Sequence, residues 1–179
     1  MQIYGDQGGQ LEFSAFETGV PELGWILESS LMACEFWESV KRQSNVSLFC
    51  PAKPVALRFG QEAAVLELAD GNVLSGKLLV GADGRDSWVR SAAGLQAVNT
   101  HYDEKGVVAN FATEKPHGNR AFQWFREDGV LAYLPLPGNQ ISIVWSAANE
   151  HADALCALEP EVFCQQVAAA GKHTLGGLR

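Results

Sequence analysis

A short run of small and charged residues offers the clearest combination of residue types for binding chemistry. It consists of Gly81, Ala82, Asp83, Gly84 and Arg85. Glycines let backbone N–H groups come close to an anion, and the start of a helix favours negative charge. The carboxylate of Asp83 could accept hydrogen bonds from sugar hydroxyls. These residue types predict a phosphate or ribose site, although an ordinary strand-to-helix turn would use the same residues.

The elements on either side of this run must position it. Three apolar residues at 78–80 predict a short buried strand that leads into the turn. Asp86 and Ser87 are suited to cap the helix expected over residues 87–93. The arrangement predicted is therefore strand, glycine turn and helix.

Other kinds of catalytic chemistry have no visible residue set. We find no Ser-His-Asp set and no signature of a catalytic cysteine, so the catalytic residues stay unidentified. The four cysteines, Cys34, Cys50, Cys156 and Cys164, show no CxxC spacing, and only four histidines accompany them. Reduced structural cysteines and no metal are expected.

Composition and charge limit the classes of protein. The 179 residues are 47% apolar and 19% charged, which is typical of a soluble globular protein. The net charge is −8 and the 13 basic residues are scattered, which argues against nucleic acid. No apolar run approaches the roughly 20 residues that a membrane-spanning helix needs. Any contact with a membrane surface would have to be made by exposed apolar residues.

The first part of the chain predicts mixed elements. We expect a hairpin from strands at 2–4 and 11–16, and then a strand at 25–27. A helix capped by Ser29 or Ser30 should bury the stripe of Ala33, Phe36, Trp37 and Val40. With a strand at 46–50, these elements predict a parallel strand-helix-strand unit of a nucleotide-binding sheet. A meander follows, with strands at 55–59, 63–68 and 73–74.

The second part predicts an antiparallel sheet packed on helices. Its strands are expected at 105–113, 120–126, 130–134 and 140–146, joined by short turns. Along these strands Phe122 and Trp124 oppose Gln123 and Phe125. Helices at 150–158 and 160–170 should cover one face of the sheet. The other face would be free for a ligand or for another part of the protein.

Residues 81–85, with Ser87 and Arg90, resemble the DG motif of the FAD-dependent aromatic hydroxylases, the group A flavoprotein monooxygenases. The branch most resembled is that of the ubiquinone-biosynthesis hydroxylases. Further matching segments follow in the family's order at 23–28, 45–51, 68–71, 108–110, 134–137 and 144–145. The resemblance implies FAD as cofactor, NAD(P)H as reductant and hydroxylation of an aromatic ring.

Two motifs of that family are missing from the sequence. These are the GxGxxG nucleotide fingerprint and a later Gly-Asp segment. The resemblance therefore implies that the chain corresponds to the middle part of a larger enzyme, and that the chain by itself is inactive. The fold class expected is α/β (α+β). Residues 25–100 would form a partial FAD-binding region, and residues 1–24 with 101–179 would form an antiparallel substrate-domain sheet packed on helices.

The resemblance also suggests positions for ligand contacts. Glu28, before the first long helix, would lie near the flavin, or it would simply cap that helix. The substrate side would draw on Trp124, Tyr133, Leu134, Leu136 and Trp145. The alternative for the aromatic residues of this group is the core of the sheet, which is the more common use of large aromatic side chains in sheets.

The segment 134–137 indicates the substrate class. Benzoate-hydroxylating relatives hold a carboxylate with a cation near this place, whereas this segment reads Leu-Pro-Leu-Pro. Because a buried carboxylate without a partner is costly, we expect an uncharged, prenylated phenol. The alternatives are another FAD-dependent oxidoreductase of the same fold, such as a reductase or halogenase, and a non-catalytic globular domain. A cytoplasmic location with contacts to a membrane or to partner enzymes is expected.

Overall fold

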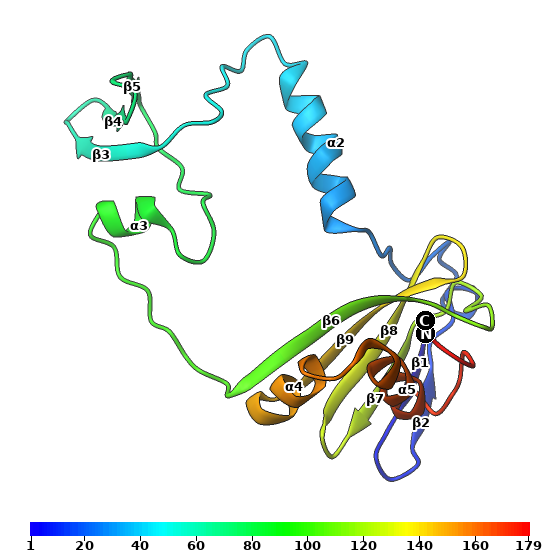
Figure 1. Ribbon diagram of the computed structural model, residues 1–179. Coiled ribbons are helices and arrows are strands. Elements are labelled where there is room, and N and C mark those ends of the chain that lie inside the picture. Colours follow the sequence, from blue (N-terminus) through cyan, green and yellow to red (C-terminus); the bar gives the residue numbers. More distant parts are fainter. The chain divides into compact units, whose positions relative to one another are not determined.

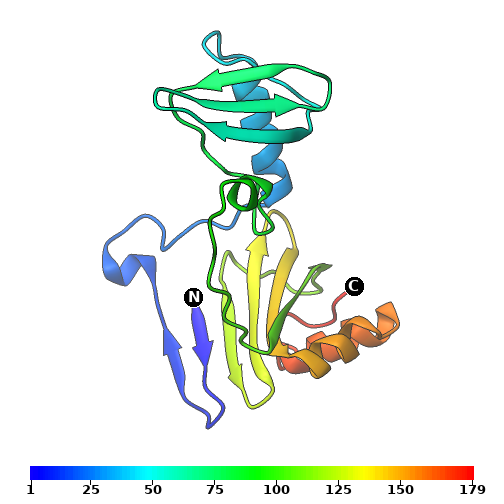
Figure 2. The same ribbon diagram turned by 90° about the vertical axis from the view of Figure 1, so that its left-hand side faces the viewer.

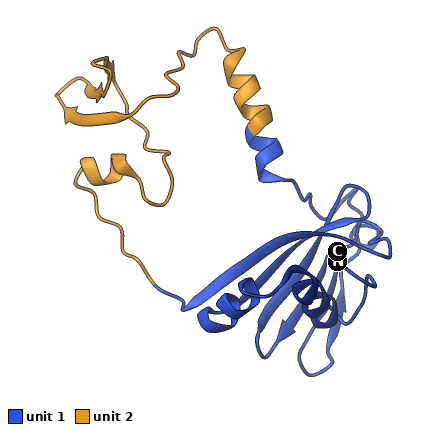
Figure 3. Cartoon of the chain, viewed as in Figure 1, with its two compact units in different colours: residues 1–33, 101–179 blue, residues 34–100 orange.

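The computed structural model describes residues 1–179, which form two compact units. Unit 1 contains residues 1–33 and 101–179, and unit 2 contains residues 34–100 (Figure 3). Unit 1 therefore combines both ends of the sequence. The predicted boundary after residue 24 differs from this division, and the roles assigned to the two regions stay predictions.

Unit 1 is built on a six-stranded sheet with the strand order β2-β1-β7-β8-β9-β6. The strands are β1 (Gln2–Tyr4), β2 (Gln10–Glu12), β6 (Glu104–Ala112), β7 (Phe122–Arg126), β8 (Gly129–Leu136) and β9 (Gln140–Ala148). All neighbouring pairs are antiparallel except β1 and β7, which run parallel. The sheet is therefore mixed, and the N-terminal hairpin extends it at the β7 edge.

Local sequence explains most of this sheet. Gly129 and Gly138 have positive φ angles of 128° and 74°, and they lie at the turns that join β7 to β8 and β8 to β9. Glycine adopts such angles without strain, so short turns can fold each strand back on the one before it. The helix α1 (Ala15–Thr18) begins where the second strand of the hairpin was expected to continue.

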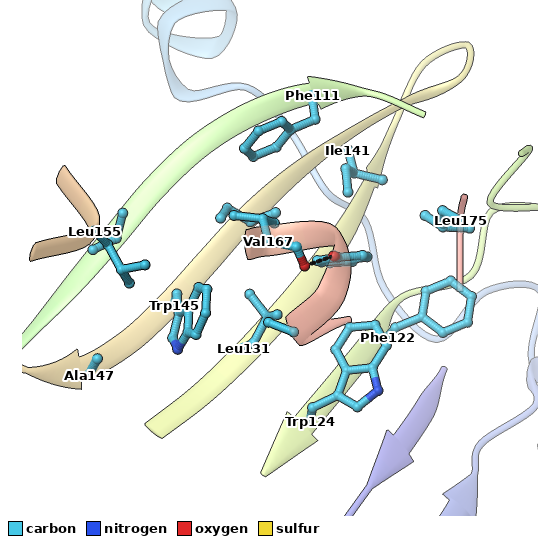
Figure 4. Close-up of a cluster of buried hydrophobic side chains, with 14 of the residues drawn as sticks. Phe111, Phe122, Trp124, Leu131, Ile141, Trp145, Ala147, Leu155, Val167 and Leu175 are labelled. Carbon is cyan, nitrogen blue, oxygen red and sulfur yellow. Dashed lines mark hydrogen bonds between the residues drawn. The ribbon is translucent and has the colours of Figure 1, made fainter. Parts of the chain in front are cut away.

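Two helices cover one face of this sheet (Figure 1). They are α4 (Asn149–Cys156) and α5 (Pro160–Ala170), and Pro160 stands in the first turn of α5, where a missing N–H costs nothing. Their buried residues Leu155 and Val167 belong to the same core cluster as Trp145 and Tyr133 of the sheet. Figure 4 shows Leu131, Trp145 and Val167 facing one another in this core.

Unit 2 contains a three-stranded antiparallel meander and short flanking elements (Figure 2). Its strands are β3 (Pro54–Phe59), β4 (Ala64–Leu68) and β5 (Val73–Gly76), and α3 (Trp88–Ala92) follows. The predicted meander is present, and Gly71, in the turn between β4 and β5, has a φ of 88°. The helix α2 (Ser29–Lys41) crosses the division between the two units.

Three predicted strands are wrong. Residues 25–27, 46–50 and 78–80 form no strand, and large apolar side chains there, such as Trp25 and Leu78, are exposed. A strand needs a neighbour to satisfy its backbone N–H and C=O groups, and no segment of the chain pairs with these. The parallel unit around α2 is therefore not formed.

The predicted burial of the α2 stripe is also wrong. No residue of α2 is buried, and Phe36 is 63% exposed. The periodicity correctly predicted the helix, because periodicity reports which residues share a face, but it does not supply the surface that would cover that face.

The predicted fold class is confirmed. The chain combines a helix-covered sheet in unit 1 with a separate antiparallel meander in unit 2. None of its helices combines the length and the apolar character that crossing a bilayer requires.

Candidate functional site

The glycine turn of unit 2 is open and its conformation depends on two glycines. Gly84 has a φ of 87°, a left-handed conformation that other residues adopt only with strain. A Cβ atom at Gly81 would come within 3.0 Å of the Val89 side chain. All residues from 81 to 86 are exposed. The backbone of this turn is therefore both accessible and sterically defined.

The carboxylate of Asp83 is bonded to the start of α3. Its Oδ1 accepts a hydrogen bond from the Ser87 hydroxyl at 2.5 Å, and its Oδ2 accepts one from the Val89 N–H at 3.1 Å. The bonds from Ser87 and Val89 lower the pKa of Asp83, because hydrogen bonds to a carboxylate stabilise its charged form. Asp83 thus orders the turn, and each of its oxygens keeps acceptor capacity for a second donor.

Two further side chains complete this arrangement. The hydroxyl of Ser87, which is itself buried, accepts a hydrogen bond from the Arg90 N–H at 2.9 Å and caps α3. The guanidinium of Arg90 donates to the Arg85 carbonyl at 2.7 Å. The conformation of the turn is therefore stabilised by hydrogen bonds of three of its own side chains, those of Asp83, Ser87 and Arg90.

The groups of this turn that are available to a ligand are backbone N–H groups and one cationic side chain. The N–H groups of Gly84 and Arg85 make no hydrogen bond within the chain. The Arg85 side chain is 93% exposed, and its nearest charged partner is Asp86 at 3.6 Å, a weak contact between two exposed groups. Free amides, a cation and residual carboxylate acceptors fit the ribose and phosphate groups of a dinucleotide such as FAD.

Glu28 lies immediately before α2, and its carbonyl accepts the Met32 N–H at 3.0 Å. Its side chain is exposed, and it makes no hydrogen bond or ion pair within the chain. Glu28 belongs to unit 1 and the glycine turn to unit 2. A contact between Glu28 and the flavin stays a prediction.

The three aromatic residues named as substrate contacts lie in the core beneath the helices. Trp124, Tyr133 and Trp145 are at most 2% exposed and belong to the same core cluster as α4 and α5. The Tyr133 hydroxyl donates to the Val167 carbonyl at 2.6 Å (Figure 4, dashed line), and burial raises the pKa of this phenol. These side chains stabilise the packing of the helices on the sheet, and at this degree of burial they are not available to a substrate.

The two leucines of the same prediction lie on the opposite side of the sheet. Leu134 and Leu136 alternate along β8 with Tyr133, so they face away from α4 and α5. Leu134 is half-buried and Leu136 is buried. We call the surface on this side the open face. Along the central strands it carries Gln123, Phe125, Ala132, Leu134, Ser142, Val144, Val108 and Asn110.

The open face is uncharged across its centre, and most of its residues there are apolar. Phe125, Val144 and Val108 are exposed there, and none of the open-face residues just named is ionisable. Glu104, at the β6 end, accepts a hydrogen bond from Ser146 at 3.0 Å. This surface can pack against a neutral aromatic or aliphatic group, but it offers no cation to a carboxylate.

A depression of about 350 Å³ lies at the end of the sheet near the β7–β8 turn. It contains Arg126, whose guanidinium bonds to both carboxylate oxygens of Asp128 at 2.6 and 2.8 Å and to the Ala170 carbonyl at 3.0 Å. The Arg126 guanidinium also lies 5.3 Å from the centre of the Trp145 ring. The charge of Arg126 is therefore already satisfied, and this depression is a weaker candidate for anion binding than the glycine turn.

Two buried polar residues escaped the sequence analysis. Thr113 and His117 are 4% and 7% exposed, and both bond to backbone carbonyls near the β8–β9 turn. A single histidine beside a glycine gives no local sign of such partners, because the carbonyls belong to residues about twenty positions away.

Comparison with solved structures defines the fold. No family model matches the chain. A probable FAD-dependent monooxygenase from Pseudomonas aeruginosa, PqsL, superimposes on 99% of this chain and 53% of its own, with a TM-score of 0.76 and 18% identity. A myxobacterial FAD-dependent halogenase, CndH, gives a TM-score of 0.72 at 15% identity over 99% of this chain and 44% of its own. The fold is that of the FAD-dependent monooxygenases and halogenases.

Comparison with curated proteins is more specific. The 3-demethoxyubiquinol 3-hydroxylase of Escherichia coli is 33% identical over 133 residues, which are 74% of this chain and 34% of that protein. The ubiquinone hydroxylase UbiL of Rhodospirillum rubrum is 31% identical over 157 residues, 88% of this chain and 37% of that protein. The ubiquinone biosynthesis monooxygenase COQ6 of Xenopus tropicalis is 45% identical over 106 residues, 59% of this chain and 23% of that protein.

The chain is homologous to the ubiquinone-biosynthesis hydroxylases, and the resemblance seen in the sequence is confirmed. It spans between about a quarter and two fifths of the length of these relatives.

Proposed function

We propose that this chain is the region of an FAD-dependent aromatic-ring monooxygenase that contributes part of the flavin site and one wall of the substrate pocket. The observation that carries the proposal is the 31% identity to a ubiquinone hydroxylase over 88% of the chain, a length that necessarily includes parts of both units. Fold likeness alone would serve a halogenase equally well.

The chain's own residues would divide the work between binding and exclusion of water. The backbone N–H groups of Gly84 and Arg85 and the carboxylate of Asp83 would hold ribose or phosphate oxygens of FAD. Bound FAD would supply the redox chemistry with dioxygen and NAD(P)H. The open face, with Leu134 at its centre, would pack on the aromatic substrate and keep water from the reacting ring.

The substrate we propose is an uncharged phenol with a prenyl tail. The open face presents Phe125, Leu134 and Val144 and no ionisable side chain at its centre. A carboxylate placed against this surface would lose its hydration without gaining a partner. The tail would gain free energy from apolar burial, at about 25 cal/mol for each Å² removed from water.

The intact protein that carries this sequence provides the test. It should be purified with bound flavin, and a prenylphenol should stimulate its oxidation of NAD(P)H. A p-hydroxybenzoate of similar ring size should stimulate it far less. Flavin binding with chloride-dependent formation of a chlorinated product would instead assign the protein to the halogenases. Absence of flavin would favour a non-catalytic domain.

A further inference from the structure

His117 makes three hydrogen bonds that fix the state of its ring. Its Nε2 lies 3.0 Å from the carbonyl oxygen of Leu136 and 2.8 Å from that of Gly138, while its Nδ1 lies 3.0 Å from the backbone nitrogen of Asn119. Carbonyls only accept, so Nε2 must carry the proton. The Asn119 N–H only donates, so Nδ1 must be unprotonated. The ring is therefore neutral, with its proton on Nε2.

The local turn holds this ring in place. The Arg120 N–H bonds to the His117 carbonyl at 3.1 Å. Gly118 and Asn119 both have positive φ angles, 58° and 55°, as a type I′ turn requires. The bond from the Asn119 N–H to Nδ1 reproduces the geometry of an Asx turn, with a ring nitrogen in place of a carboxamide oxygen.

The two carbonyls bonded by Nε2 belong to the end of β8 and to the turn after it. A second residue of the same segment, Thr113, reaches the next carbonyl of that turn. Its N–H bonds to the Asn139 carbonyl at 2.9 Å, and its hydroxyl donates to the Lys115 carbonyl at 2.8 Å, with the Asn139 carbonyl at 3.3 Å. The segment 113–117 therefore holds the carbonyls of residues 136, 138 and 139.

That segment is itself fixed by the C-terminal residues. The N–H of Lys115 bonds to the Leu175 carbonyl and that of Glu114 to the Gly177 carbonyl, each at 3.0 Å. The Glu114 carboxylate in turn accepts the Gly177 N–H at 2.7 Å. His117 thus joins the end of β8 to a segment that is itself hydrogen-bonded to the C-terminal residues.

We propose that His117 is a positioning residue that sets how β8 presents Leu134 to the substrate. This rests on the proposed function, which places the ring against the open face. Without the imidazole, the Leu136 and Gly138 carbonyls would lose their donor, and the β8 end could shift by a fraction of an ångström. Small displacements of pocket walls reduce productive binding even when the fold survives.

Three variants separate the bonds from Nε2 to the two carbonyls from the bond that Nδ1 accepts within the local turn. His117→Gln keeps a donor that reaches the Leu136 and Gly138 carbonyls, but loses the contact to Asn119. His117→Asn keeps an acceptor for the Asn119 N–H, but is too short for the carbonyls. His117→Ala loses both. A positioning role predicts that Gln restores function and Asn does not.

The test has one arm that does not depend on catalysis. Nitrogen-15 NMR of the intact protein should show His117 as the neutral Nε2–H tautomer, with a slowly exchanging imidazole proton. A doubly protonated ring or the Nδ1–H tautomer at neutral pH would overturn the proposal, whatever the variants do.

The second arm uses the intact enzyme. His117→Ala and His117→Asn should raise the KM for the prenylphenol by about tenfold or more, with unchanged FAD affinity, and His117→Gln should restore it towards the parent value. Equal KM values in all three variants, or rescue by Asn but not by Gln, would contradict a positioning role. If the parent enzyme hydroxylates no phenol, the proposed function fails while the tautomer result still stands.

Discussion

The Ser87 hydroxyl donates a hydrogen bond to Oδ1 of Asp83 at 2.5 Å and accepts one from the Arg90 N–H at 2.9 Å. One hydroxyl therefore joins the glycine turn to the first turn of α3. The carboxylate that the motif shares with the aromatic hydroxylases is thus oriented by the first turn of its own helix.

We expect the effects of Asp83→Ala and Ser87→Ala to overlap. Both substitutions remove the bond between Asp83 and Ser87, and each removes one further bond, from the Val89 N–H or from the Arg90 N–H. The double variant should therefore loosen the turn by less than the sum of the two single variants. Heteronuclear NOEs of the Val89 and Arg90 amides measure this loosening, and Asp86→Ala, in an exposed neighbour, is the control. Additive losses in the double variant would show that the two side chains act independently.

The same bonds predict a dependence on pH. They lower the pKa of Asp83, so the order they provide is complete above the ordinary carboxylate pKa and is lost as the pH falls through the lowered value. The Val89 amide resonance should follow this titration in the parent chain and should not follow it in Asp83→Asn. A titration above the ordinary aspartate pKa would contradict the assignment.

Tyr133→Phe should destabilise unit 1 by about 1–2 kcal/mol, because the buried Val167 carbonyl loses its tyrosine donor. The measurement is urea unfolding followed by tryptophan fluorescence, to which the buried Trp124 and Trp145 of the core contribute. Tyr102→Phe is the matched control, since Tyr102 is 83% exposed. An equal effect of the two substitutions would refute the importance of the Tyr133 bond.

Gly171→Ala, as a single substitution, should also destabilise unit 1. A Cβ atom at Gly171 would overlap the hydroxyl and ring of Tyr133, which cannot move without breaking the bond to Val167. Overpacking of this kind costs about 1–3 kcal/mol. Gly9→Ala is the control, because no atom lies within 4 Å of its new Cβ. A wild-type melting temperature for Gly171→Ala would show that α5 can move away from the sheet.

Leu134→Arg in the intact enzyme should shift its substrate preference towards a carboxylate. The new cation would lie on the open face, where it penalises a prenyl tail and offers a partner to a carboxylate. The ratio of kcat/KM for p-hydroxybenzoate to that for a prenylphenol should rise by about tenfold or more, the effect of about 1.4 kcal/mol. Val162→Arg, on an exposed position of α5, should leave the ratio unchanged.

The antiparallel part of the fold could be predicted because its information is local. Asp128 and Gly129, or Gly138 and Asn139, lie between alternating strands, and each hairpin needs only its own residues and its neighbour. Pairing of β1 with β7 could not be predicted, because it joins residues about 120 positions apart through a parallel contact with no turn between them.

The candidate site shows the same limit. Alternation correctly separated Trp124 from Phe125, but it could not tell which face would meet α4 and α5. The aromatic residues were candidates both for substrate contact and for the core, and the structure packs them under the helices. The glycine turn was found because its residue types act together within a few positions. His117 was missed because its partners at 136 and 138 adjoin it only in the folded chain.

Isotope labelling of the intact protein tests the central claim most directly. With NAD(P)H, a prenylphenol and ¹⁸O₂, the monooxygenase reaction converts one ring C–H to C–OH, reduces the second oxygen atom to water and oxidises NAD(P)H. We predict one ¹⁸O atom in each molecule of hydroxylated product, measured by mass spectrometry, and none when the label is supplied as H₂¹⁸O. Hydroxyl oxygen drawn from water, or NAD(P)H oxidation that yields only hydrogen peroxide with every phenol offered, would contradict the account.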